Sequence, residues 1–170
     1  FDEPKWGVRN NFFAEENIAK LLEVWRMTKR PIFHIKHDST EPNSPLRPDL
    51  PGNEIKDIVK PQASEHLIIK NVNSAFIRTD LEKRLRENEI KTLVMVGLTT
   101  DHCVSTTARM ASNLGFTVYV VSDATATFDR EGFNEKHYSA EQMHELALVS
   151  LQNEFATIID AMLVFEVAKM

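Results

Sequence analysis

The only cysteine of the chain, Cys103, lies in the stretch "VMVGLTTDHCVSTTARMASNLG", residues 94–115. A free cysteine is commonly a small buried hydrophobe, whereas its thiolate is a strong nucleophile. The preceding run "TLVMVG" is apolar throughout, which is typical of a strand in a covered parallel sheet. After the cysteine, Val104, Ala108 and Ala111 recur at helical spacing. The pattern therefore places Cys103 in a turn between the end of a strand and the start of a helix.

This position suits a nucleophile. In parallel α/β sheets, ligands bind beyond the carboxyl ends of the strands. The free N–H groups and the positive dipole end at a helix N-terminus favour a thiolate and can face an oxyanion. Gly97 allows a sharp bend before the turn, as in the strand–nucleophile–helix elbow of serine hydrolases, although their glycine pattern is absent. Position alone leaves both the buried and the reactive reading of Cys103 open.

The elements around this turn alternate between strand and helix. One helix is expected from about residue 11 with a cap at Asn10 or Asn11, and a second after a cap at Thr79. Further helices are expected after Cys103 as far as Gly115, from the capping box "SAEQ" at Ser139, and at the C-terminus. Strands are expected at 31–37, 66–70, 92–97, 117–124 and 155–160. This alternation predicts βαβ units and one doubly wound α/β domain over residues 1–170, with a long loop at 38–53.

The composition excludes several classes of protein. The net charge of −5 argues against a nucleic-acid partner, because phosphate binding needs a basic face. No apolar run has the length of a membrane span, and a single cysteine fits a reducing, cytoplasmic setting. No glycine-rich nucleotide motif is present, so no cofactor is expected.

Three segments carry a resemblance to a known family. The stretch "VGLTTDHCVSTTARMASNLGFTVYVVSDATATF" resembles the signature of the isochorismatase-like cysteine hydrolases, in the nicotinamidase/isochorismatase superfamily. Upstream, "IIKNVNSAFIRTDLEKRL" is similar to their K-x-x-x-S-A-F segment, and "SAEQMHELALVSLQNEFATII" to their last helix and strand. The resemblance covers essentially the whole chain. It implies a three-layer, mainly parallel six-stranded sheet with the strand order 3-2-1-4-5-6.

The resemblance also implies a catalytic triad of Asp, Lys and Cys. It assigns Cys103 as the nucleophile and Lys70 as the lysine, which ends the strand "HLIIK" at the same edge of the sheet. Without the resemblance, a snorkelling surface lysine would be the default interpretation. The family further implies a cis peptide at Leu98–Thr99, with the N–H groups of Thr99 and Cys103 forming the oxyanion hole.

The aspartate of the triad is not found in these 170 residues. The family carries it at the end of its first strand, whereas "FDEP" resembles the segment just after that strand, so Asp2 is not expected to be the base. The first strand itself is also expected to lie upstream of Phe1. A protein that lacked the catalytic aspartate would be a non-catalytic binding or scaffold protein on the same fold, and this alternative is kept.

Other candidate ligands and pocket residues come from the loops and from the histidines. His34 and His37 are three residues apart on a strand and point to opposite faces, so no metal site is expected from them. His37 and Asp38, at the strand end, are expected only to touch substrate or to cap the loop. His102, His137 and His144 are expected on solvated surfaces. The resemblance places the aromatic residues Trp6, Phe76 and Phe128 over the active site as substrate contacts.

The reaction expected from these residues is hydrolysis of an amide or related C–N bond of a small molecule through a thioester. Hydrolysis of an isochorismate-type vinyl ether is a second possibility on the same fold. A redox-sensing thiol ranks last because no resolving cysteine is present. The resemblance and the apolar "AMLVFEV" near the C-terminus also suggest a homo-oligomer.

Overall fold

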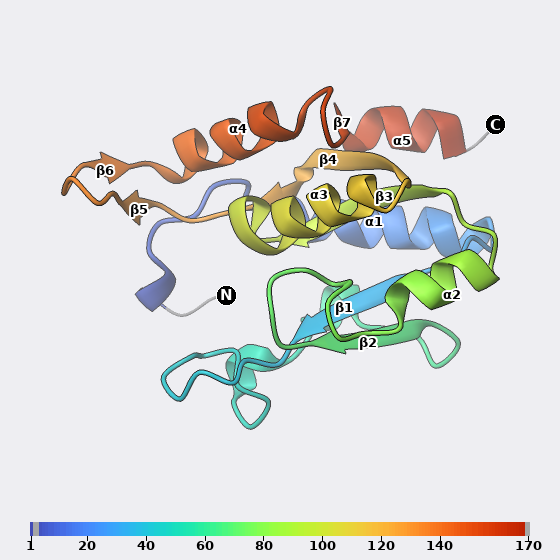
Figure 1. Cartoon of the computed structure of the whole chain (residues 1–170), viewed down its shortest axis with the longest axis horizontal. Coiled ribbons are helices and arrows are strands. Elements are labelled where there is room, and N and C mark those ends of the chain that lie inside the picture. Colours follow the sequence, from blue (N-terminus) through green and yellow to red (C-terminus); the bar gives the residue numbers. More distant parts are fainter. Residues whose placement is uncertain (2–3, 169–170) are drawn as a thin grey trace.

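A computed structural model describes residue 1 and residues 4–168 of the chain. Its parallel strands form two groups. One contains β1 (Phe33–His37) and β2 (His66–Lys70), and the other contains β3 (Thr92–Leu98), β4 (Thr117–Ala126) and β7 (Thr157–Ile159) in the order β3-β4-β7 (Figure 1). A small antiparallel hairpin of β5 (Arg130–Glu131) and β6 (His137–Tyr138) follows β4. The architecture is the α/β class predicted from the alternating pattern.

Helices cover both faces of the strands. Helices α1 (Ala14–Met27) and α5 (Ala161–Ala168) lie on one face, and α2 (Leu81–Glu87), α3 (Ser105–Asn113) and α4 (Ala140–Leu151) on the other. Short 3-10 turns at Pro4–Trp6, Pro51–Asn53 and Asp57–Val59 lie in the connecting segments. Helices on both faces of mainly parallel strands define the doubly wound arrangement.

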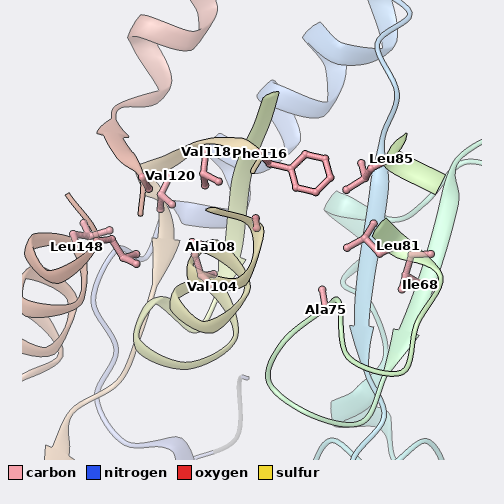
Figure 2. Packing of buried hydrophobic residues seen from close by; sticks show 13 residues of the cluster. Ile68, Ala75, Leu81, Leu85, Val104, Ala108, Phe116, Val118, Val120 and Leu148 are labelled. Atoms are coloured by element: carbon pink, nitrogen blue, oxygen red, sulfur yellow. The ribbon is translucent and has the colours of Figure 1, made fainter. Parts of the chain in front are cut away.

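Two apolar clusters hold these layers together. The cluster on the side of α1 and α5 contains Ile18, Leu21, Val121, Ala124, Ala161 and Val164. The other cluster joins β4, α3 and α4 to α2 and β2, and Figure 2 shows Phe116 pointing toward Leu85 between these parts. Adjacent residues Val120 and Val121 of β4 are both fully buried, each in a different cluster. The continuous apolar run in β4 is thus explained by burial on both faces.

The two groups of strands face each other across a groove. Every residue of β1 and every residue of β3 lines a cavity of about 1760 Å³, together with residues of α1 and α5. β1 pairs only with β2, and β3 only with β4, among the described residues. The carboxyl ends of β2 and β3 nevertheless meet at the same edge, because Lys70 at the end of β2 contacts Cys103 just beyond β3. Among the described residues no strand pairs with both groups. The full order 3-2-1-4-5-6 therefore stays a prediction.

Two of the expected helix ends are correct, whereas the expected caps at Asn10 or Asn11 and at Thr79 are wrong, since Asp80 occupies the N-cap of α2. Ser139 and Gln142 form the predicted capping box at the start of α4. Gly115 follows the C-cap Leu114 of α3 with φ +86°, a conformation that favours glycine. At α1, however, Phe13 occupies the N-cap without a side-chain cap. Asn11 instead donates its amide hydrogens to the carbonyls of Ser122 and Thr125. Because its side chain makes these tertiary hydrogen bonds, it does not cap the helix.

No helix in the described part of the chain combines the length and the apolar character that a membrane crossing requires.

Candidate active site

Cys103 lies in a π-helical turn, Thr100–Val104, between β3 and α3. The strand leads into this turn through Gly97, whose φ of +122° is accessible to glycine and coincides with a register shift against β4. Shortly after Gly97, the peptide bond between Leu98 and Thr99 is cis, at the position that the resemblance implies. The turn therefore presents the thiol at the carboxyl edge of the strands, half-buried and reduced.

Lys70 reaches the same thiol from the end of β2. Its side chain is buried, with only 5% of the residue exposed, and its Nζ lies 3.1 Å from the Sγ of Cys103. The ammonium also donates to the carbonyl of Val72 at 3.0 Å and lies 3.0 Å from Nδ1 of His37. The snorkelling interpretation of Lys70 is therefore wrong: the ammonium is held inside the protein beside the thiol.

The polar contacts of Cys103 among the described residues are those with Lys70 and with Oδ1 of Asn73, the latter at 3.9 Å. Neither is a proton acceptor of the kind that a thiol needs for activation, since an ammonium has no free lone pair and an amide oxygen is a very weak base. Asp2, which the sequence already sets aside as a base, lies outside the described residues.

A buried histidine contacts the turn that carries Cys103. Nδ1 of His144, on α4, lies 2.9 Å from the hydroxyl oxygen of Thr100. His144 is only 4% exposed, so the expectation of a solvated surface residue is wrong. Burial lowers the pKa of His144, although the carboxylates of Glu141 and Glu145 oppose that shift. The neutral imidazole thus links α4 to the start of the turn.

Asp101, two residues before the nucleophile, joins the turn to the segment after β4. Its Oδ1 accepts a 2.6 Å hydrogen bond from the hydroxyl of Thr127, and its Oδ2 lies 3.3 Å from the guanidinium of Arg130. Burial alone would raise the pKa of Asp101, but the bond from Thr127 and the nearby side chains of His102 and Arg130 outweigh it and hold the pKa below its usual value. His102 itself is exposed, as expected.

The three predicted pocket aromatics occupy different environments. Phe76 is half-buried and lines the cavity that also contains Cys103 and Lys70. Phe128 is only 1% exposed and stacks on Trp6 with ring centroids 5.7 Å apart, and neither of these two residues lines that cavity. Phe1, which the sequence did not single out, stacks on Phe128, packs with a tilted ring against Trp6, and does line the cavity. Trp6 and Phe128 thus form a packed base beneath Phe1.

The two histidines of β1 have separate partners. Nε2 of His34 lies 2.8 Å from Glu65 Oε2, whereas Nδ1 of His37 contacts Lys70. No group of three or more His, Cys, Asp or Glu side chains among residues 1 and 4–168 is arranged to hold a metal ion.

Sequence reasoning left two contributors to the site unassigned. His37 was expected only to touch substrate or to cap the loop, yet it contacts the ammonium of Lys70. Asn53, in the loop after β1, donates to the carbonyls of His37 and Leu46 and is 5% exposed. The position of His37 at a strand end was an available signal, whereas Asn53 has no local pattern that distinguishes it from other loop residues.

A thiol held beside a buried ammonium at the carboxyl edge of parallel strands defines an α/β protein equipped for nucleophilic chemistry. Comparison with known proteins agrees with this class. Residues 14–162 match the Isochorismatase domain. The chain is 52% identical over 159 residues to the uncharacterized isochorismatase family protein YrdC of Bacillus subtilis, covering 94% of this chain and 85% of that protein.

More distant and structural relatives extend the comparison. A crystal structure of an isochorismatase-family protein from Chromobacterium violaceum superposes with a TM-score of 0.95 at 40% identity, covering 99% of this chain and 87% of that one. Nicotinamidase 3 of Arabidopsis thaliana is 27% identical over 157 residues, covering 85% of this chain and 74% of that protein. The chain belongs to the isochorismatase family of hydrolases.

Proposed function

We propose that this protein is a cysteine hydrolase that cleaves an amide or related C–N bond of a small molecule through a thioester on Cys103. The observation that carries the proposal is the 3.1 Å contact between the Nζ of Lys70 and the Sγ of Cys103. An ammonium at this distance stabilises the thiolate over the thiol, and the thiolate is the attacking species.

The reaction proceeds in two steps. The thiol proton passes to a carboxylate base, and the Cys103 sulfur attacks the substrate carbonyl carbon. The N–H groups of Thr99 and Cys103 stabilise the resulting oxyanion. Collapse of this intermediate breaks the C–N bond, and the base returns its proton to the leaving amine. Water, deprotonated by the same base, then hydrolyses the thioester to a carboxylic acid and the free thiol.

The proposal assigns the base to an aspartate outside the 170 residues, on a strand that pairs with both β1 and β3. The groove between these strands supports this assignment, because it is lined along its length by two strand edges and by apolar side chains of α1 and α5. A parallel strand in this groove would end at the edge where Cys103 and Lys70 meet. Its last residue would then be close enough to accept the thiol proton.

The identity of one relative supports an amide as substrate. The Arabidopsis relative carries the name nicotinamidase, which denotes hydrolysis of a primary amide. That protein shares 27% identity with this chain, so the comparison supports the bond type and leaves the rest of the substrate to the side chains around the cavity.

The experiment is an amide screen on the full-length protein with ammonia or amine release as the readout. Cys103→Ala is expected to abolish turnover of any amide that the wild type hydrolyses, and Asn113→Ala, at the exposed end of α3, serves as the matched control. Acid quenching during turnover should leave an acyl group on Cys103, detected by mass. Full turnover by Cys103→Ala would refute the proposal.

A further inference from the structure

His37 is a polar side chain in the site that the proposed chemistry does not use. It is the last residue of β1, and its register partner in β2 is Lys70. Their side chains meet as well as their backbones, with 3.0 Å between Nδ1 of His37 and Nζ of Lys70. The question is what a histidine does beside a buried ammonium.

The hydrogen bonds of Lys70 account for all of its donors. An ammonium carries three hydrogens and has no lone pair. The acceptors within reach are the Val72 carbonyl at 3.0 Å, His37 Nδ1 at 3.0 Å and Cys103 Sγ at 3.1 Å. A buried charge is costly unless its donors are satisfied. Two fixed acceptors therefore leave the third hydrogen directed at the sulfur.

This contact determines the state of the imidazole. Because the ammonium can only donate, Nδ1 of His37 must be unprotonated, and Nε2 carries the hydrogen of the neutral ring. Burial lowers the pKa of His37, the charge of Lys70 lowers it further, and Asp38 acts in the opposite direction. Asp38 is itself paired with Lys36 at 3.0 Å.

The backbone around His37 is held on both sides. The N–H of Asp38 donates to the carbonyl of Lys70 at 2.8 Å, and the side-chain amide of Asn53 donates to the carbonyl of His37 at 2.7 Å. Asn53 is buried and also donates to the carbonyl of Leu46. These bonds fix the end of β1 relative to β2, so the backbone of His37 keeps its position beside Lys70.

We propose that His37 is a positioning residue that acts through Lys70: its neutral Nδ1 holds the ammonium so that one N–H points at the Cys103 thiolate. The inference deepens the proposed function and rests on it for the effect on turnover. Protonation of His37 removes the acceptor and puts a second cation beside Lys70. Cys103 reactivity therefore depends on two groups, the thiol itself and a neutral His37.

Cys103 is the only cysteine in these 170 residues, so iodoacetamide alkylation located by mass on the peptide that carries Cys103 reports on this thiol. The rate is measured by mass from about pH 5 to about pH 9, a range that spans ordinary His and Cys titrations. His37→Leu removes the acceptor. His37→Asn places an amide oxygen close to the position of Nδ1 and cannot titrate. His137→Asn, at an exposed histidine of β6, is the matched control.

In His37→Leu the alkylation rate near neutral pH is expected to fall about tenfold, which corresponds to about 1.4 kcal/mol. His37→Asn and His137→Asn should stay within about threefold of the wild type. On the acid side, the wild-type rate should fall more steeply with pH than the rate of His37→Asn, by up to the same factor of about ten, because protonation of His37 removes the acceptor just as His37→Leu does. Circular dichroism melts identify variants that are folded.

Two results would overturn the inference. One is a His37→Leu rate equal to that of the wild type. The other is an equal loss in folded His37→Leu and His37→Asn, which would mean that the ring's shape matters and its acceptor does not. Once the screen has identified an amide substrate, a positioning role predicts that His37→Leu lowers kcat and leaves KM little changed. A rise in KM alone would make His37 a substrate contact.

These outcomes separate the inference from the proposed function. Cys103→Ala that keeps amide turnover, combined with slow alkylation of His37→Leu, would refute the proposed function and leave the role of His37 standing. Inactive Cys103→Ala combined with normal alkylation of His37→Leu would do the reverse.

Discussion

The Nζ of Lys70 and the Sγ of Cys103 lie 3.1 Å apart, although the two residues are 33 positions apart in the sequence. Lys70 ends β2 and Cys103 follows β3 in the turn before α3. The contact forms because parallel strands bring their carboxyl ends to one edge of the fold. It also requires Lys70 to be buried, which its hydrogen bonds to Val72 and His37 make possible.

Removing the ammonium should disable the nucleophile without unfolding the protein. In Lys70→Met, amide turnover is expected to fall about 100-fold, the usual cost of losing one electrostatic contact in an active site. Lys83→Met on the exposed surface of α2 is the control. Steady-state kinetics and thermal melts measured side by side provide the check, and undiminished turnover in a folded Lys70→Met would contradict the role of the lysine.

The buried pair of His144 and Thr100 should contribute strongly to stability. His144→Ala opens a cavity and leaves the Thr100 hydroxyl without this partner, so a loss of about 2–4 kcal/mol in the free energy of unfolding is expected. Leu146→Ala on the exposed side of the same helix should change stability by less than about 0.5 kcal/mol. Urea denaturation of both variants tests the difference, and equal midpoints would argue against it.

The lowered pKa of His144 predicts a pH dependence of stability with a definite sign. In the folded protein this base binds a proton less readily than in the unfolded chain. The unfolded state therefore takes up protons first as the pH falls below about 6.5, and stability decreases from there toward the lower folded pKa. Urea midpoints between about pH 7 and about pH 5 should fall less in His144→Asn than in the wild type. Parallel curves would contradict this prediction.

Glu15 should make the stability depend on pH in a more acidic range than His144 does. Burial would raise its pKa, but hydrogen bonds from Arg9 and Lys56 prevail and lower it to about 2. Because the folded pKa is below the unfolded value of 4.5, the stabilisation is present above pH 4.5 and is lost as the pH falls toward 2. The wild type should lose about 2 kcal/mol more than Glu15→Gln between about pH 5 and about pH 3.

The neighbouring carboxylate provides the control for this measurement. Glu16 lies on the same turn of α1 but is exposed, so Glu16→Gln should follow the wild-type acid profile. If Glu15→Gln and Glu16→Gln gave the same dependence on pH, the ion pairs of Glu15 would not be the cause.

The sequence determined the local elements and the candidate nucleophile. Apolar runs and helical periodicity predicted the strands and helices near their observed bounds, and "SAEQ" and Gly115 marked helix ends correctly. These signals are readable because they depend on near neighbours in the chain. The position of Cys103 between a strand end and a helix start followed from the same reasoning.

Only the tertiary structure decided which side chains serve the site. His144 resembles any polar residue on an amphipathic helix, yet the packing of α4 against the nucleophile turn buries it beside Thr100. Asn11 does not cap α1, because its side chain donates to two carbonyls near the end of β4. His37 meets Lys70 through strand register, a relationship between segments that are far apart in sequence. Burial and hydrogen bonding depend on which segments pack together, and local residue patterns do not encode that choice.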